Sequence, residues 1–407
     1  MKYILRNKIL LVVFVLVVAL FPNIIALPQQ SRTENIITAM GIDKNNGEYE
    51  VSIQYVIPFA DSPSNSLKVM SGKGETVGDA VENMDREYGK NSGFAHCRAV
   101  IFNDEACENN LTEILDFLLR IKTNTNDIVL INTKDSAKKL LESVYRLDDE
   151  FYTIINSNGI ANEQRKYQDL KSIGDYYNAQ FGESKALAVS RINLKEEEKD
   201  ESQNSTQNSS EKSQQGSQSS GQKPSQKIEN NGEVAIIKDG KKILSLDKDE
   251  SKNLAWFDNF IKESSAQVKN FTDETYRNAD INFYVYDKNA SVNVSFENGE
   301  PIYTLNLKVY LRTAQIIENG TRKEVYEINK KEFSPKLKYE IANSIKQELL
   351  SAEENFKTYD YDVVHCEELF HKFHPYKYAD FKKTLSYFES FISHTAFRYN
   401  VEVIQRL

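Results

Sequence analysis

The residues best suited to chemistry form a short run near the end of the chain: His365, Cys366, Glu367, Glu368, His371 and His374. Residues three or four apart share a face of a helix, and zinc accepts all these ligand types. However, the run contains no His-Glu-x-x-His motif and no pair of cysteines. The side chains between them are apolar and typical of a core: Leu369, Phe370 and Phe373. We therefore predict a helix edged by His and Glu, and no metal site.

The glycine-rich stretch Ser71–Thr76 resembles a phosphate-binding loop only superficially. Such a loop needs Gly-x4-Gly-Lys-Ser/Thr after a buried strand, so that backbone N–H groups and the lysine surround the phosphates. Here Lys73 lies between Gly72 and Gly74. We predict a turn that leads into a helix capped by Thr76.

Nucleophilic catalysis needs an activated Ser or Cys with a positioned base. The chain has no Gly-x-Ser-x-Gly motif. His96 and Cys97 are adjacent on an expected strand, His96–Asp104, where neighbours point to opposite faces. Cys97 and Cys107 could form a disulfide, and the sequence leaves this open. We predict no catalytic residues, no cofactor and no enzymatic activity.

The N-terminal segment, residues 1–27, predicts delivery to a membrane. Three basic residues precede the apolar run Ile9–Phe21, which is followed by Pro22. This order is that of an export signal, and the positive-inside rule places the body of the chain outside the cytoplasm. The segment is either cleaved or retained as an anchor, and we favour retention because no clear small-x-small cleavage site is present. No Cys follows the apolar run, so thiol lipidation is excluded there.

Composition limits the class of protein. The 407 residues carry 51 Lys and Arg against 60 Asp and Glu, a net charge of −9 that argues against a nucleic-acid partner. Residues 200–232 are mostly Ser, Gln and Asn, with one large apolar residue, Ile228. Such a segment cannot bury enough surface to offset its ordering entropy, and we predict a disordered insertion.

Hydrophobic patterns predict an α+β fold in three mixed α/β domains, each a twisted sheet with packed helices. The N-terminal domain, residues 32–145, reads as extended chain, a turn over Asp43–Glu48, a second strand, and then alternating helices and strands. We expect helices at Thr76–Tyr88, Leu111–Ile121 and Asp135–Tyr145, and a strand at Asp127–Asn132.

The middle domain, residues 146–275, contains the insertion. We expect strands at Ala186–Leu194 and Glu233–Leu246, the second bent at Asp239–Gly240, and helices at Tyr167–Tyr177 and Asp249–Lys262. Because strands flank the insertion, we expect it to loop out from one sheet. The C-terminal domain, residues 280–407, combines alternating strands, a helix at Ser334–Phe356, helices broken at Pro375 and a final strand.

The ordered blocks resemble the Ger(x)C family, the C subunits of spore germinant receptors. Arg32–Pro58 resembles the family's opening, in which Arg-x-Glu leads to a Gly-Ile-Asp strand and a hairpin. Ser71–Arg120 resembles its next stretch, from Gly-x-Thr to a helix ending in Arg, and Val234–Phe257 resembles the segment that closes the middle domain. The C-terminal third is similar in pattern only.

The resemblance implies a non-enzymatic subunit in nutrient-triggered spore germination. It implies a place at the outer face of the spore inner membrane and assembly with membrane-spanning A and B subunits. Two features depart from the family: the missing lipidated Cys, which gives the N-terminal segment more weight as an anchor, and the insertion at residues 200–232. An extracytoplasmic small-ligand-binding protein is the alternative.

The family pattern carries over no site residues. Four positions stand out for testing, and we predict structural roles for them. Gly41–Asp43 are expected in a turn, Arg120 at a helix C-terminus where the dipole favours a positive charge, and His96 at a strand edge.

Overall fold

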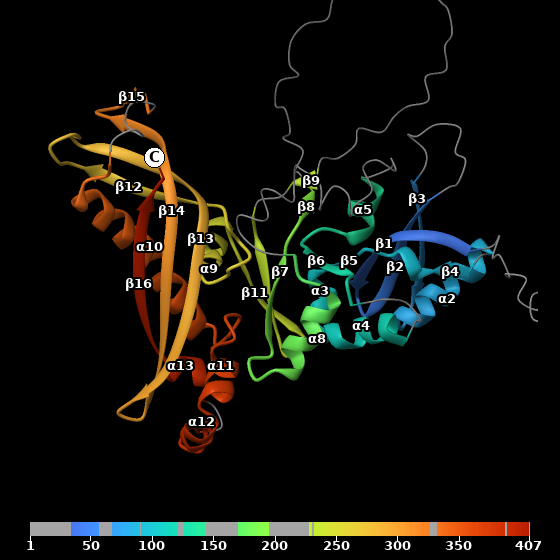
Figure 1. Cartoon of the computed structure of the whole chain (residues 1–407). Helices are drawn as coiled ribbons and strands as arrows, with labels where there is room; N and C mark the ends of the chain where they lie inside the picture. Colours follow the sequence, from blue (N-terminus) through green and yellow to red (C-terminus); the bar gives the residue numbers. More distant parts are fainter. Residues whose placement is uncertain are drawn as a thin grey trace, which may run out of the picture.

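The structure is a computed structural model that describes residues 34–56, 67–89, 91–120, 126–143, 170–194, 228–229, 232–325, 332–386 and 389–406. Within these ranges the fold is α+β, as predicted (Figure 1). We call its three larger sheets the first sheet (β3-β2-β1-β5-β6, with β4 on β1), the second sheet (β11-β10-β7) and the C-terminal sheet (β12-β13-β14-β15, with β16 on β14). Strands β8 and β9 form a separate pair.

The first sheet begins with the predicted hairpin. Asn46 and Gly47 have φ angles of 53° and 86°, the left-handed values that a tight two-residue turn requires. β1 then pairs in parallel with β5, and β5 with β6. The strands of this sheet are β1 Glu34–Asn45, β2 Glu48–Val56, β3 Leu67–Gly74, β4 Asn91–Gly93, β5 Ala99–Asn103 and β6 Val129–Thr133.

Helices cover both faces of the first sheet. On one face lie α2 (Val77–Tyr88), α3 (Asp104–Asn109), α4 (Leu111–Arg120) and α8 (Ile173–Phe181), which share one apolar core with the sheet. On the other face α5 (Ala137–Glu142) buries its apolar side chains against β1, β5 and β6. Thr76 caps α2 as predicted, by accepting a bond from the Asp79 N–H.

The prediction that Gly41–Asp43 lie in a turn is wrong, because β1 runs on to Asn45. Gly41 is needed for close packing: a Cβ there would lie 3.1 Å from the Ala137 Cβ of α5. Asp43 is buried and accepts bonds from the N–H groups of Ala137 (2.8 Å) and Lys138 (3.0 Å), so it fixes the start of α5.

The predicted strand His96–Asp104 is also wrong at its start. Phe94–His96 form a short 3-10 helix, η2, closed by a bond from the Cys97 N–H to the Phe94 carbonyl. The turn forms because Phe94 is buried in the core, while His96 is left exposed.

Two strands of the second sheet, β7 and β10, are buried on both of their faces. β7 (Ala186–Ser190) and β10 (Val234–Lys238) pair antiparallel, and β11 (Lys241–Leu246) continues the sheet through the predicted turn at Asp239–Gly240. One face contributes Leu187, Val189 and Ile237 to the core of the first sheet, and the other packs on the C-terminal unit. Two-sided burial explains the apolar runs of β7 and β10, whereas β11 is largely exposed.

The strands that flank the insertion pair with each other, as predicted, and β8 (Asn193–Leu194) pairs with β9 (Ile228–Glu229) at its base. Two predicted helices have other bounds. α8 begins only after Ser172, whose side chain and that of Asp175 form a capping box. α9 spans Lys248–Ala255 and ends where Trp256 is buried and donates from Nε1 to Glu348 (2.6 Å).

The C-terminal unit consists of the C-terminal sheet with a long helix across one face (Figure 1). Ser334 caps α10 and Pro335 is its first residue, as predicted. The strands are β12 Ser264–Phe271, β13 Ala279–Glu297, β14 Glu300–Glu318, β15 Thr321–Lys323 and β16 Ala396–Gln405. The helices are α10 Pro335–Thr358, α11 Cys366–Phe373, α12 Pro375–Lys382 and α13 Phe391–His394.

Residues 1–27 and most of residues 200–232 lie outside the described residues. Within the described ranges no helix combines the length and the apolar character that a membrane crossing requires. The division into three domains stays a prediction.

Candidate functional site

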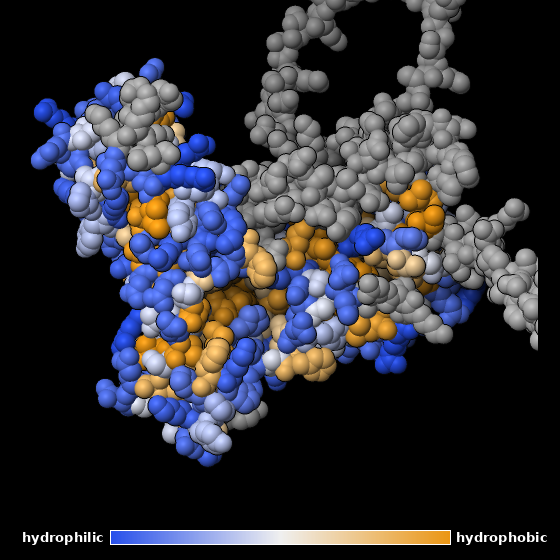
Figure 2. All heavy atoms as spheres, in the orientation of Figure 1, coloured by the Kyte–Doolittle hydropathy of each residue, from blue (hydrophilic) through white to orange (hydrophobic). Residues whose placement is uncertain are grey.

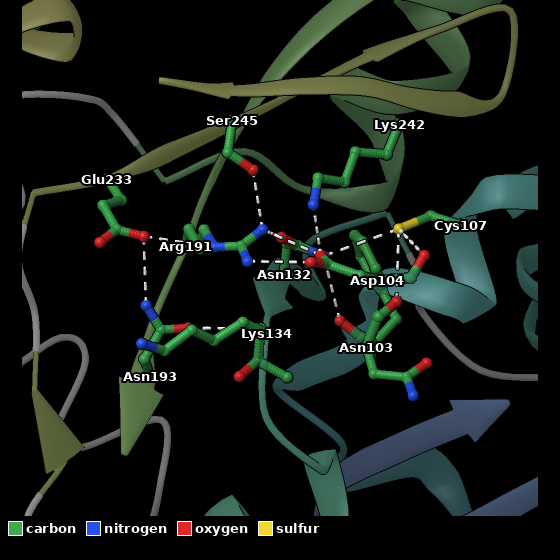
Figure 3. Close-up of polar contacts among 12 residues, drawn as sticks. Asn103, Asp104, Cys107, Asn132, Lys134, Arg191, Asn193, Glu233, Lys242 and Ser245 are labelled. Atoms are coloured by element: carbon green, nitrogen blue, oxygen red, sulfur yellow. Dashed lines mark hydrogen bonds and ion pairs between the residues drawn. The ribbon is translucent and has the colours of Figure 1, made fainter. Parts of the chain in front are cut away.

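Arg191 is buried and is the centre of a polar cluster between the first and second sheets (Figure 3). Its guanidinium donates to both carboxylate oxygens of Asp104 (2.9 Å each), to the Asn132 side-chain oxygen (2.7 Å) and to the Ser245 hydroxyl (2.8 Å). Lys242 adds a second ion pair to Asp104, at 2.6 Å. We call these five residues the Arg191 cluster.

The elements that position the cluster explain its location. Asp104 follows β5 and Asn132 lies in β6, so both stand at the carboxyl ends of parallel strands. Arg191 follows β7, while Lys242 and Ser245 lie in β11 of the second sheet. In open α/β sheets ligands bind at the carboxyl ends of the strands. Here the Arg191 guanidinium occupies that position, so the geometry joins two sheets.

The electrostatics agree with a structural ion pair. Burial by itself raises the pKa of Asp104, but hydrogen bonds from Arg191 and Lys242 outweigh it and hold the pKa below its usual value. Arg191 Nε lies 3.3 Å from a Glu233 carboxylate oxygen, without the alignment of a hydrogen bond. The Arg191 side chain is only 7% exposed, so removal of the Asp104 carboxylate would leave a buried guanidinium without the partner that holds it by two bonds.

A second set of polar contacts joins the second sheet to the C-terminal unit. Glu368 of α11 accepts bonds from the Ser184 N–H (3.0 Å) and hydroxyl (2.7 Å), just before β7. Burial opposes ionisation of Glu368, yet bonds from His365 and Ser184 lower its pKa to about 2. Lys238 of β10 pairs with Asp360 at 2.8 Å. The second sheet is thus fastened by charges on both sides.

The predicted run from His365 to His374 does not converge on one point. His371 Nδ1 contacts Glu183 Oε1 (2.8 Å), whereas His374 Nε2 contacts the Val294 carbonyl (2.8 Å) on β13. Cys366 is buried, and Glu367 accepts bonds from Tyr378 and Lys382. Within the described ranges, no three His, Cys, Asp or Glu side chains are placed to hold a metal ion.

The contacts of Arg120, Cys97 and Cys107, the remaining residues singled out from the sequence, indicate structural roles. Arg120 ends α4, as predicted, and pairs with Asp116 at 2.7 Å on the surface. Cys97 and Cys107 are buried free thiols, and burial raises the pKa of each to about 12. Neither thiol is therefore poised as a nucleophile.

Sequence reasoning did not find the Arg191 cluster. The available signal was that Arg191 is the single charged residue of the mostly apolar stretch Ala186–Leu194. Its partners Asp104 and Lys242 lie in stretches far apart in the sequence, with nothing local to connect them.

Comparison with known proteins identifies the family. The family model described as spore germination protein N-terminal domain matches residues 31–194. The one described as spore germination B3/GerAC like, C-terminal, matches residues 232–406. The chain belongs to the Ger(x)C family. In this Ger(x)C chain the two matched regions lie on either side of the Ser/Gln/Asn-rich insertion.

A comparison with curated proteins gave no match. Among solved structures, the Ger(x)C chain is similar to one titled "Crystal Structure of the GerBC protein", with a TM-score of 0.50 and 14% sequence identity. The alignment covers 90% of this chain and 97% of the other. At 14% sequence identity, this structural similarity shows a shared fold and nothing about function.

Proposed function

We propose that this Ger(x)C protein is a non-enzymatic, membrane-associated subunit of a spore germinant-receptor complex. It acts in nutrient-triggered germination through contacts with membrane-spanning A and B subunits, on the extracytoplasmic face of the spore inner membrane. The three domains predicted from the sequence are part of this proposal.

The Arg191 cluster carries the non-enzymatic part of the proposal. At the strand ends where a ligand or substrate would bind, Asp104 is held by two cations, and Asn132 and Ser245 are used by the same guanidinium. Groups held in mutual pairs have no free capacity for proton transfer to a substrate. The cluster instead gives the subunit a fixed shape to present to partners.

The N-terminal segment supports the membrane part. Its basic flank and apolar run would hold the folded body beside membrane partners, and tethering raises the effective concentration of two binding surfaces without new contacts. No lipidated Cys is available near residue 27, so the peptide itself serves as the anchor.

The test is made in spores that carry an affinity-tagged full-length chain. We expect the chain in the membrane fraction, and we expect the A and B subunits to copurify with it after mild detergent extraction. Deletion of the chain should reduce nutrient-triggered germination, and the wild-type copy should restore it.

A chain found in the soluble fraction after gentle lysis would contradict membrane association. Unchanged germination of the deletion strain with every nutrient tested would contradict the receptor role. Turnover of a substrate by the purified chain would contradict the non-enzymatic role.

A further inference from the structure

The outer edge of β16 carries backbone groups that no other strand uses within the residues that the structure describes. β16 pairs with β14 alone, in parallel. The N–H of Arg406, which follows β16, donates to the Leu311 carbonyl at 3.1 Å, and successive residues of a strand turn their backbone groups to opposite edges. The even-numbered residues of β16 therefore face β14. Its odd-numbered residues, from Phe397 to Val403, direct their N–H and C=O groups outward.

The apolar side chains of β16 on the face that α10 covers are incompletely buried. Val401 is half-buried, whereas Leu307, its register partner in β14, is buried. Figure 2 shows apolar side chains at the surface of the C-terminal unit where β16 runs in Figure 1. The strand contains no proline and its register with β14 has no bulge, so two usual obstacles to a further strand are missing from it. The half-buried set is Phe397, Tyr399, Val401 and Val403.

The exposed face of β16 is complementary in charge to a second copy of itself. Arg398, Asn400 and Glu402 follow one another along this face. If a second β16 runs antiparallel with a two-fold axis at Asn400, Arg398 lies opposite Glu402 of the second copy, and Asn400 lies opposite itself. The same register opposes Tyr399 to Val401 of the second copy. Both are odd-numbered residues with outward backbone groups, so each such pair exchanges two hydrogen bonds.

The intrachain partners of these charges fit the same arrangement. Arg398 is bound to Glu297 by two bonds of 2.7 Å, and Glu402 lies 3.0 Å from Lys308. All four side chains are about half exposed, at 48–59%. Across the paired edges the charges would then alternate, from Lys308 and Glu402 to Arg398 and Glu297 of the second copy. An exposed pair adds at most about 1 kcal/mol, so the charges select the register, while backbone bonds and apolar contacts supply the affinity.

The flank of α10 beside β16 adds exposed apolar surface. Lys357 Nζ lies 5.5 Å from the centre of the Phe397 ring, so this flank of the helix is next to β16. Leu350 and Tyr339 precede Lys357 by about two and five helical turns, so they share its flank. Their side chains are 45% and 67% exposed. A second copy at the edge of β16 would bring the two flanks toward each other and cover these side chains.

We propose that two copies of this chain associate through β16, which pairs antiparallel with β16 of the second copy and joins the two C-terminal sheets. The two-fold axis passes at Asn400, and the interface uses the same surface of both copies. Both α10 helices then lie on one face of the joined sheet. The inference goes beyond the proposed receptor role and does not rest on it.

One added cysteine tests both the association and its register. Opposite residues of a non-hydrogen-bonded antiparallel pair have Cα atoms about 4.5 Å apart, which a disulfide can bridge. The full-length chain with Asn400→Cys is purified in detergent and oxidised by air with copper–phenanthroline. The native thiols of Cys97, Cys107 and Cys366 are buried. The matched control is Asn306→Cys: Asn306 accepts a bond from Asn400 at 2.8 Å, but would lie three strand spacings, about 14 Å, from its own copy.

We expect at least about tenfold more disulfide-linked dimer from Asn400→Cys than from Asn306→Cys. Val401→Pro, added to Asn400→Cys, should lower this yield by about tenfold or more, because proline removes an outward N–H and no bond to β14. The Val401→Pro chain should keep its cooperative unfolding transition. Arg398→Glu should also lower the yield, since it opposes two carboxylates, and Glu402→Arg in the same chain should restore it.

Equal dimer yields from Asn400→Cys and Asn306→Cys would overturn the proposal, as would an unchanged yield in a folded Val401→Pro chain. If Val401→Pro loses its unfolding transition, the charge exchange carries the test, and a yield that Glu402→Arg does not restore overturns the register. In spore membranes, a thiol–amine reagent that links Asn400→Cys to an A or B subunit instead of a second copy would assign the edge to another protein. Copurification of those subunits is measured separately, so either proposal can fail alone.

Discussion

At the scale of single residues, two arginines make the same contact in different surroundings. Arg191 and Arg398 each hold a carboxylate through two hydrogen bonds, to Asp104 (2.9 Å each) and to Glu297 (2.7 Å each). The Arg191 side chain is 7% exposed, whereas that of Arg398 is 53% exposed. Burial therefore decides how much each pair contributes.

We expect Arg191→Ala to lower the free energy of unfolding by about 1–3 kcal/mol, because the buried Asn132 loses a charged donor and Asp104, whose side chain is 31% exposed, keeps Lys242 as its partner. Arg398→Ala should cost less than about 1 kcal/mol, since water solvates the freed Glu297. Urea unfolding of both variants checks this. Equal losses would show that the Arg191 cluster does not fasten the sheets.

Lys288 is a buried cation of the C-terminal sheet. It is 1% exposed, donates to the Ala255 carbonyl and lies 5.5 Å from the Trp256 ring. Burial lowers its pKa from 10.5 to about 7. Below about pH 7 the Lys288 ammonium is charged in both the folded and the unfolded chain, and its burial destabilises the fold. Between about pH 7 and 10.5 the unfolded chain keeps the proton and the folded chain releases it. Lys288 therefore makes the free energy of unfolding rise with pH in that window.

Lys288→Met should therefore stabilise the fold at pH 6 by a few kcal/mol. The shift of the pKa from 10.5 to about 7 corresponds to a burial cost of at most about 5 kcal/mol. Part of this gain is lost because the Ala255 carbonyl loses its donor. The gain should shrink as the pH approaches 10. Thermal unfolding at pH 6 and pH 9 measures it, with the exposed Lys308→Met as control. A gain that does not change with pH would contradict the buried charge.

At the scale of elements, the packing of α2 on β3 depends on glycine. A Cβ at Gly72 would lie 2.4 Å from the Ala80 carbonyl oxygen and 2.6 Å from the Met84 Cβ, so α2 would have to move. Gly78, inside α2, has no such neighbour: its nearest atom would be 3.6 Å away.

Gly72→Ala should destabilise the protein by about 2–4 kcal/mol through overpacking. Gly78→Ala should be neutral or stabilise it by up to about 1 kcal/mol, because alanine is the better helix former. Denaturant unfolding of the two single variants compares them directly. A tolerant Gly72→Ala would mean that α2 is not seated closely on the sheet.

At the scale of the whole molecule, the pairing of β8 with β9 predicts that the insertion between them is dispensable for folding. Leu194 of β8 lies opposite Ile228 of β9, so the ends of the segment between them are neighbours. Replacement of residues 195–227 by a short Gly-Ser turn should raise stability by at most about 2 kcal/mol, from the smaller loop-closure entropy.

Calorimetry and copurification of the partner subunits test this replacement. The control removes residues 193–229, which also deletes Leu194 from the core and the Asn193 side chain that accepts the Lys134 N–H at 3.0 Å. That deletion should destabilise the fold. Loss of partner binding in the shorter replacement alone would give the insertion a role beyond spacing.

The sequence by itself determined the tight turns and the helix caps, because residues close together in the chain form them. The Asn46–Gly47 hairpin, the Thr76 and Ser334 caps and the long helix after Pro335 all follow from residues within a few positions of each other. The ordered blocks along the chain also predict the family, which the two family models confirm. Bounds that depend on packing, such as the end of α9 at Ala255, were missed.

Only the tertiary structure decided which charges meet. Asp104, Arg191 and Lys242 lie on three separate elements, and their pairing depends on the second sheet being buried between two units. The run from His365 to His374 is the opposite case: its residues are close in sequence and of types that bind metals. The packing of α11 nevertheless turns His371 toward Glu183 and His374 toward the Val294 carbonyl. Proximity in sequence sets local conformation, whereas burial and sheet contacts set the chemistry of a site.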